Sequence, residues 1–349
     1  MSLPSEGSAY DPMFEPSAQA TASIPADDSE RAKKDVHQVV SPRVGDALWD
    51  DETIASVRIP RDSLDVSRMI GSGAYTEVFS ALYCGSLVTI KMLPPDMRRS
   101  NFHINALLAG AKLMARIEHP HIVRLVGVAW DSPTDLCLVV EYMEGGNLRA
   151  LLDTYAAQGH PVGFNRMKMK IALHVANALT YLHSLDPPVL HRDVRSKKIL
   201  LSAELEAKLT DFGVSRERAG RTMTAGVGTY LWMAPEVMLG EKYDDKADVF
   251  SFGVVLSELD THVLPYSNAK ENSDTGRKLP DAAILQMVAL GKLRAEFSTA
   301  GPKAVMALGE ACMAMDPKER PTAAEAMLEL ERILTDELQL VDDEESKTS

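Results

Sequence analysis

The hydrophobic pattern of this chain changes near residue 145, and that change limits its fold more than any other feature. Before it, runs such as VTIKML and LCLVVEYM are short, apolar and rich in β-branched residues, which is typical of buried strands. After EGGNL, apolar residues recur at helical spacing, as at Ile171, Val175, Leu179 and Leu182. We therefore expect an α+β fold with a small β-rich lobe, one helix near residues 99–117 within it, and a larger, mainly helical lobe.

Size and composition exclude several classes of protein. A chain of 349 residues suits one large two-lobed domain with tails. Its net charge of −13 argues against a general binder of nucleic acids or anionic membranes, because both are polyanions. Cys84, Cys137 and Cys312 are scattered and form neither a zinc ligand set nor a disulfide framework. Without a signal peptide or an apolar run of membrane-spanning length, we expect a cytoplasmic protein with no membrane segment.

Composition also suggests where the folded domain begins and ends. The first 46 residues are rich in Ser, Pro, Ala and acids, so they cannot bury enough apolar surface to offset the entropy of ordering. Residues 267–279 are polar and are expected to form a surface loop. The expected divisions are a disordered segment 1–46, a packed N-terminal strap 47–63, a domain 64–335 (N-lobe 64–142, hinge 141–146, C-lobe 147–335) and a solvated acidic tail 336–349.

Two short motifs in the first lobe suit phosphate binding. IGSGAYTEVF contains Gly71 and Gly73, which let backbone amides approach a triphosphate without an intervening Cβ, and then Val78. VTIK ends in Lys91, whose ammonium group on a central strand would neutralise phosphate charge. Alone, each signal is weak: many strand turns contain two glycines, and an exposed strand lysine is the simpler interpretation of VTIK.

The order of the later motifs changes this interpretation. HRD at 191–193, DFG at 211–213 and GTYLWMAPE at 228–236 are followed by ADVFSFGVVLSEL and DPKERPT. Together the motifs resemble the protein kinase family over residues 64–335. The motifs GTYLWMAPEV and RPT are most similar to those of the tyrosine-kinase-like group, which mostly phosphorylates Ser and Thr. The resemblance implies a bilobal kinase fold that uses ATP and Mg²⁺ and acts on a protein substrate or signalling partner.

The resemblance also implies roles for individual residues. Asp193 would accept the proton of the attacking hydroxyl, and Arg195 would lie near the transferred phosphoryl group. Asp211 would ligate magnesium, and Lys91 would contact the α and β phosphates. The residues expected to bind the nucleotide are Gly71, Gly73, Val78, Lys91, Glu141, Met143 and Leu200.

Further residues are expected to support the site. Val140 resembles the gatekeeper, and Asp248 resembles the residue that holds the catalytic-loop backbone. Glu236 and Arg320 resemble an ion pair that stabilises the helical lobe. The apolar column that aligns the two lobes would consist of Met114, His191 and Phe212.

The sequence departs from the family pattern at several positions. Lys198 replaces the catalytic-loop Asn, whose neutral carbonyl oxygen holds a magnesium ion that an ammonium group cannot hold. Gly110 stands where the lone N-lobe helix should supply a Glu to pair with Lys91, and the sequence from Met97 to Ile117 contains no acid. Thr76 replaces the third glycine of the phosphate loop. Thr89, in place of an alanine, is a milder change beside the adenine.

Regulation is expected in the activation segment. Arg192 resembles the arginine that pairs with a phosphate on this segment, and Thr222 and Thr224 are the acceptors nearest in pattern. The alternative is that both are ordinary loop threonines.

Three functions remain open from the sequence. The first is a serine/threonine protein kinase weakened by Gly110 and Lys198, and the second is a pseudokinase that acts as a nucleotide-binding scaffold or allosteric partner. A small-molecule kinase is the third, disfavoured because such enzymes generally lack the Ala234-Pro235-Glu236 segment. Thr229 favours Ser and Thr hydroxyls over Tyr.

Overall fold

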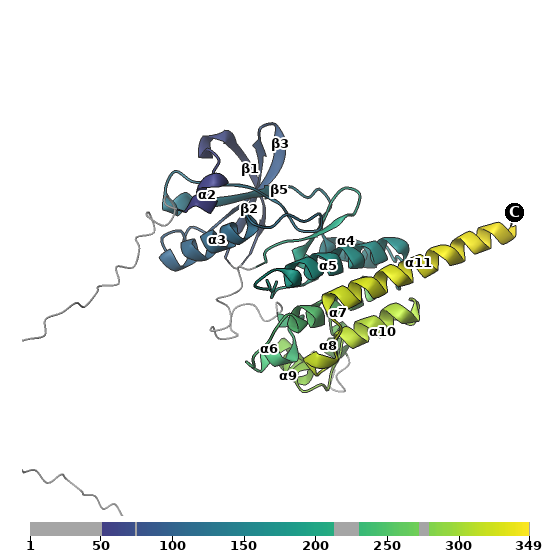
Figure 1. The fold of residues 1–349 in the computed structure, drawn as a ribbon. Helices are drawn as coiled ribbons and strands as arrows, with labels where there is room; N and C mark the ends of the chain where they lie inside the picture. The colour runs from purple at the N-terminus through teal and green to yellow at the C-terminus, as the bar shows by residue number, and fades with distance from the viewer. Residues whose placement is uncertain (1–50, 74, 213–229, 272–278, 349) are drawn as a thin grey trace, which may run out of the picture. The chain divides into compact units, whose positions relative to one another are not determined.

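The computed structural model describes residues 51–73, 75–212, 230–271 and 279–348, and it confirms the expected α+β, bilobal fold. Strands predominate in the first part of the domain and helices in the second, as Figure 1 shows. The expected disordered segment 1–46 and the first four residues of the expected strap lie outside the described residues.

A five-stranded antiparallel sheet forms the β-rich part. Its strands are β1 (Leu64–Ser72), β2 (Glu77–Tyr83), β3 (Ser86–Met92), β4 (Leu125–Ala129) and β5 (Cys137–Glu141), in the spatial order β1-β2-β3-β5-β4. The strand register places Gly71, Val78, Lys91 and Leu138 in one row across β1, β2, β3 and β5. The glycine-rich turn and the strand lysine are therefore neighbours in space.

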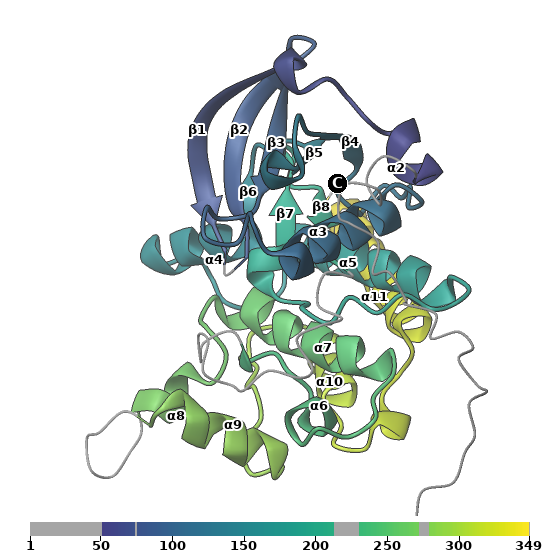
Figure 2. The ribbon, with the colours of Figure 1, turned by 90° about the vertical axis from the view of Figure 1, so that its left-hand side faces the viewer.

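Helix α3 (Asn101–Met114) packs beside this sheet, as predicted for residues 99–117 (Figure 2). It begins after Ser100, whose hydroxyl caps the first turn by accepting a hydrogen bond from the backbone N–H of His103 at 3.5 Å. Its buried residues lie at helical spacing and join the main core. They are Ile104, Leu107, Leu108, Gly110, Ala111 and Met114.

The described part of the expected strap joins α3 to the sheet. Helix α2 (Glu52–Ser56) contacts α3 and buries Ile54 completely. Asp51 caps α2 and also pairs with Lys112 of α3 at 2.8 Å. The hydrogen bond from Lys112 holds the pKa of Asp51 below its usual value. The strap backbone then pairs with that of β4.

The helical part is built around α7, which is buried along nearly its whole length. Its helices are α4 (Leu148–Ala157), α5 (Arg166–Ser184), α6 (Pro235–Met238), α7 (Lys246–Thr261), α8 (Ser267–Glu271), α9 (Asp281–Ala289), α10 (Lys303–Cys312) and α11 (Ala323–Thr348). Short 3-10 helices are η1 (Arg61–Ser63), η2 (Pro133–Asp135), η3 (Ser196–Lys198) and η6 (Pro317–Glu319). Helices α5 and α11 lie side by side (Figures 1 and 2). The apolar stripe predicted in α5 is confirmed, because all of its members are buried: Ile171, Val175, Leu179 and Leu182.

A second, three-stranded sheet leads the chain to Asp211. Its strands are β6 (Gly146–Asn147), β7 (Ile199–Leu201) and β8 (Ala207–Leu209). Two imidazole rings fix the start of β8 from outside the sheet. His121 Nδ1 lies 3.2 Å from the Ala207 carbonyl oxygen, and the Ala207 N–H donates to His174 Nδ1 at 3.1 Å. The two rings stack with their centres 4.0 Å apart.

The structure differs from the predictions in two segments, the expected surface loop 267–279 and the expected acidic tail 336–349. The predicted surface loop 267–279 is wrong at its start, because Ser267–Glu271 form α8; Ala, Lys and Glu in SNAKE are strong helix formers. Helix α11 begins after a Thr322–Glu325 capping box and continues into the expected acidic tail as far as Thr348. Among the helices that the structure describes, none is both long and apolar enough to cross a bilayer.

The two stacked imidazoles predict that acid destabilises the domain. Burial lowers the pKa of His174 to about 4, and the neighbouring His121 and Lys170 add to this effect. The unfolded chain, with a histidine pKa near 6.5, therefore binds more protons than the native state between about pH 6.5 and 4. Native stability should fall as pH falls through that range, by on the order of 1 kcal/mol for His174 after allowance for solvent screening.

Urea denaturation as a function of pH would check this, with His174→Asn as the comparison. The asparagine Oδ1 can still accept the Ala207 N–H but does not titrate, so the pH slope of the variant should be smaller. Some slope should remain, because the pKa of His262 is also lowered by burial to about 4. Equal slopes for the two proteins would contradict the assignment.

Candidate active site

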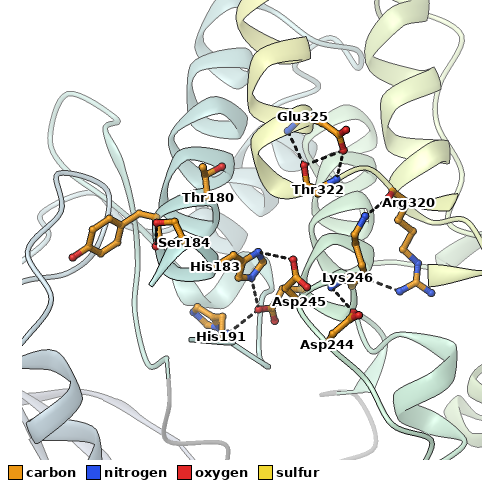
Figure 3. Close-up of polar contacts among 12 residues, drawn as sticks. Thr180, His183, Ser184, His191, Asp244, Asp245, Lys246, Arg320, Thr322 and Glu325 are labelled. Atoms are coloured by element: carbon orange, nitrogen blue, oxygen red, sulfur yellow. Dashed lines mark hydrogen bonds and ion pairs between the residues drawn. The ribbon is translucent and has the colours of Figure 1, made fainter. Parts of the chain in front are cut away.

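The backbone of the expected catalytic loop is held by a buried carboxylate on α7. Asp248 Oδ2 accepts the N–H of His191 at 2.8 Å, and its Oδ1 accepts the N–H of Arg192 at 2.7 Å. His183 of α5 adds a contact to Oδ2 at 2.9 Å. Although burial opposes ionisation, these hydrogen bonds hold the pKa of Asp248 below its usual value. Figure 3 shows the His183 ring directed at this end of α7, where it also lies 3.8 Å from Asp245. The predicted role of Asp248 is confirmed by these bonds.

Asp193 is already paired within the loop. Arg195 Nε lies 3.0 Å from Asp193 Oδ1, and Arg195 Nη2 lies 3.4 Å from Oδ2. The structure places the Arg195 guanidinium on the carboxylate of Asp193, and its expected place near the transferred phosphoryl group stays a prediction. Asp193 can act as a proton acceptor only where this ion pair leaves one of its oxygens accessible.

Asp211 lies between two ammonium groups. Lys91 Nζ is 2.5 Å from Oδ1, and Lys198 Nζ donates to Oδ2. The side chains of Lys91, Lys198 and Asp211 are 10%, 19% and 28% exposed, respectively. The cluster is therefore mostly but not fully withdrawn from water. Burial raises the pKa of Asp211, but the nearby charges of Lys198 and Lys91 outweigh this and lower it well below its usual value. The carboxylate is therefore ionised and bound on both oxygens.

Lys91 has a second partner that sequence reasoning missed. Its Nζ donates to the Thr210 hydroxyl at 2.7 Å, in a bond that is buried. Thr210 also accepts a contact from His191 Nε2 on its carbonyl oxygen at 3.1 Å, which ties it to the catalytic loop. The only sequence signal for this role was its position immediately before the DFG motif.

Helix α3 offers no charged partner to Lys91. Gly110 is buried on the same helix as Met114, and α3 contains neither Asp nor Glu. That Gly110 occupies the position of the missing helix acid stays a prediction. The ammonium group of Lys91 is directed instead to Asp211 and Thr210.

The residues expected to bind a nucleotide lie on β1, β2, β3, β5 and β7 and on the segments that follow β1 and β5. Gly73 N–H donates to the Thr76 carbonyl oxygen at 2.7 Å, which closes the turn despite the missing third glycine. The Glu141 side chain is engaged, because it accepts the Arg124 N–H at 2.7 Å and Lys208 Nζ at 2.9 Å. Their roles in binding stay predictions, as do those of Gly71, Val78, Met143 and Leu200. The expected gatekeeper Val140 pairs in register with Thr89.

A buried glutamate under the catalytic loop was also missed. Glu258 of α7 is fully buried and accepts hydrogen bonds from Ser196 at 2.7 Å and Arg149 at 2.8 Å through Oε1, and from Trp232 at 2.7 Å through Oε2. Burial raises the pKa of Glu258 and these donors oppose the rise. An acid inside the apolar run FSFGVVLSEL was the signal that could have identified it.

Other predicted contacts are present in the described residues. Glu236 and Arg320 form a buried bidentate pair at 2.7 and 2.8 Å, and Lys246 Nζ donates to the Arg320 carbonyl oxygen (Figure 3). The rings of His191 and Phe212 lie 6.4 Å apart, and Phe212 and Met114 belong to one core. Thr222, Thr224 and Thr229 lie outside the described residues, so the pairing of the first two with Arg192 stays a prediction.

Comparison with known proteins agrees with this geometry. The model of the family described as "Protein kinase domain" matches residues 64–329. The chain is 34% identical over 274 residues to serine/threonine-protein kinase CTR1 of Arabidopsis thaliana, which covers 77% of this chain and 31% of that protein. It is 32% identical over 304 residues to serine/threonine-protein kinase STY17 of the same plant, covering 84% and 50%. It is 33% identical over 285 residues to mitogen-activated protein kinase kinase kinase 10 of Mus musculus, covering 79% and 28%. The chain thus spans half or less of the length of these relatives.

The residues present fit magnesium poorly. Protein kinases generally hold it with the DFG aspartate and the catalytic-loop asparagine. Here both oxygens of Asp211 bind ammonium groups, and the second position is itself an ammonium group, Lys198. Among the described residues, no cluster of three or more His, Cys, Asp or Glu side chains suits a metal ion. A cation would have to displace at least one lysine from Asp211.

The contact between Lys91 and Thr210 gives a testable outcome. Thr210→Val keeps the shape of the side chain but removes the acceptor, so the Lys91 ammonium group loses its hydrogen bond to residue 210 and keeps its contact with Asp211. We expect ATP to bind about 3- to 10-fold more weakly, as for the loss of one typical hydrogen bond worth about 1 kcal/mol. Titration with a fluorescent ATP analogue measures this. Thr210→Ser should restore binding; equal affinity in the valine variant and the wild type would show that Thr210 does not position Lys91.

Proposed function

The chain belongs to the protein kinase family, in its tyrosine-kinase-like group, and on this premise we propose that it transfers the γ-phosphoryl group of ATP to protein hydroxyls at a reduced rate. The observation that carries the proposal is the 2.5 Å ion pair between Lys91 and Asp211, which lie 120 residues apart in sequence. Beside it, Asp248 fixes the backbone that carries Asp193. The nucleotide-directed charges and the catalytic-loop aspartate are thus both retained.

The choice of hydroxyl is part of the proposal. The names of the matched relatives are those of serine/threonine protein kinases. Thr229, by its resemblance to the family pattern, also favours Ser and Thr as acceptors. We propose Ser and Thr side chains of a protein as acceptors, because the Ala234-Pro235-Glu236 segment suits a protein substrate, and Glu236 is bound by Arg320 as expected.

The reduction in rate follows from the charges around Asp211. Phosphoryl transfer depends on positioning and charge neutralisation rather than on covalent participation by the protein. The helix acid that would orient Lys91 is absent at Gly110, and Lys198 occupies one oxygen of the Asp211 carboxylate. A unit-charge pair 4 Å apart at an effective dielectric of 20 is worth about 4 kcal/mol before desolvation, so this competition is not small. Loss of one transition-state group commonly costs about 10²- to 10³-fold in rate.

A pseudokinase is the second candidate, favoured by a specific observation. Asp193 and Asp211 are both engaged by cationic side chains, Arg195 on the first and Lys198 with Lys91 on the second. If these pairs persist when nucleotide binds, the protein would act through its shape and its bound nucleotide rather than through chemistry. The two candidates differ in one measurable respect, which is transfer that depends on Asp193.

We predict that Lys198→Asn raises phosphoryl transfer. The amide restores the family's ligand and releases one oxygen of Asp211, so the rate at saturating Mg²⁺ should rise by about 10- to 10³-fold. The measurement is transfer of labelled γ-phosphate to the protein itself and to a generic basic protein. Lys197→Asn is the matched control, because this neighbouring lysine carries the same charge but its side chain is exposed, whereas Lys198 binds Asp211.

Asp193→Asn sets the baseline of that assay. Wild-type transfer above this baseline supports the proposed activity, and transfer equal to it would exclude the activity in favour of the scaffold. Gly110→Glu, alone and combined with Lys198→Asn, separates the two departures. We expect the combination to exceed either single variant, with a gain that is not the product of the two because Lys91, which the glutamate would orient, and Lys198 share the carboxylate of Asp211.

A further inference from the structure

The two departures from the family pattern change the charge of the site in the same direction. Gly110 in place of the family's glutamate removes one negative charge, and Lys198 in place of the family's asparagine adds one positive charge. Together they make the site more positive by two charges, which is the charge of one divalent cation. The described site now holds three cations, Lys91, Arg195 and Lys198, against the two carboxylates of Asp193 and Asp211.

We infer that this site binds the triphosphate of a nucleotide without a divalent cation, with the ammonium group of Lys198 supplying positive charge beside Asp211 in place of the metal. The inference rests on the nucleotide site of the proposed function and goes beyond it, because it concerns the form of nucleotide that is bound. Its ligand class is a nucleoside triphosphate free of metal. In this interpretation the two departures together replace the charge of the metal in binding, although each is a loss for catalysis.

The position of Lys198 supports this directly. Its ammonium group binds Asp211 Oδ2, on the carboxylate whose other oxygen binds Lys91. Lys91 also stands in register with Val78 and, through β2, with Gly71 of the glycine-rich turn. The ammonium groups of Lys91 and Lys198 therefore share one carboxylate next to the strands expected to carry the phosphates.

Both lysines have enough freedom to contact a ligand. Each ammonium group has three donor hydrogens, so the bond of Lys198 to Asp211 leaves it two for phosphate oxygens, and the bonds of Lys91 to Asp211 and Thr210 leave it one. The Lys198 side chain is 19% exposed, nearly twice the exposure of Lys91. No large rearrangement is needed before Lys198 meets a ligand, whereas a divalent cation must first displace an ammonium group from Asp211.

The test compares ATP with adenosine, each titrated calorimetrically into the purified full chain with excess EDTA and, separately, with Mg²⁺. The ratio of the adenosine Kd to the ATP Kd reports what the triphosphate contributes. In EDTA we expect wild type to bind ATP at least about tenfold more tightly than adenosine, one decade being about 1.4 kcal/mol. Lys198→Asn should lose this preference in EDTA and regain it with Mg²⁺.

Three further variants make the comparison specific. Lys198→Met keeps the aliphatic stem without the charge and should behave like Lys198→Asn in EDTA. Lys198→Arg keeps the charge and should retain at least part of the preference for ATP. Lys197→Asn removes one charge from the same 3-10 turn and should behave like wild type. Thermal unfolding of each variant without ligand verifies that it is folded.

Several results would overturn the inference. These are a wild type that binds ATP no more tightly than adenosine in EDTA, a Lys198→Asn variant that keeps the wild-type preference there, or an equal loss in Lys197→Asn. The outcome of the phosphoryl-transfer assay is independent of the outcome of this binding test. Binding of ATP in EDTA without Asp193-dependent transfer would remove the proposed catalysis and leave the inference standing. Transfer with Mg²⁺ but no binding in EDTA would do the reverse.

Discussion

The carboxylate of Asp211 lies between two ammonium groups, and the arrangement of the residues around it follows from that. Lys91 comes from the central strand β3, Lys198 from the end of the catalytic loop, and Asp211 from the residues that follow β8. One ionised group thus ties together the β-rich part and two segments of the helical part. The charges of both lysines keep the pKa of Asp211 low despite its burial, so the attachment persists across the neutral pH range.

The segments that carry this cluster are fixed by buried polar side chains rather than by apolar packing alone. Asp248 holds the two N–H groups that precede Asp193, and Glu258 binds Ser196 in the turn that contains Lys198. Both acids come from the same helix, α7, which is itself almost entirely buried. A buried acid is costly unless its hydrogen-bonding capacity is met, and each of these two has at least three donors. The loop therefore has little freedom except in its side chains.

Much of the fold could be predicted from the sequence, because strand and helix periodicity carry it directly. The sheet strands, helix α3 and the buried stripe of α5 correspond to local patterns, and the ordered motifs identified the family. The departures at Gly110 and Lys198 could also be predicted, since each breaks a fixed spacing. The sequence could not predict which side chains contact each other in the folded protein. Lys91 was expected to lack its usual partner, the helix acid, and only the fold shows that the Thr210 hydroxyl lies 2.7 Å from its ammonium group.

The same limit applies to other contacts. The contact of Glu258 with Ser196 and those of the two imidazoles with Ala207 join residues that are distant in sequence, so no local pattern encodes them. Arg195 and Asp193 are only two residues apart, but their pairing depends on the conformation of the loop. Helix α8 was missed for the opposite reason. Its residues have helical propensity, but the polar stretch that contains them suggested a loop.

A double-mutant cycle on the free energy of unfolding, with Lys198→Met and Asp211→Asn, tests the central ion pair most directly and needs no ligand. Urea denaturation at neutral pH of the wild type, both single variants and the double variant gives the coupling between the two side chains. A carboxylate held by both lysines predicts a stabilising coupling of about 1 to 3 kcal/mol, typical of charged groups within one network. Additive effects, with a coupling near zero, would show that Lys198 does not hold Asp211 and would contradict the account.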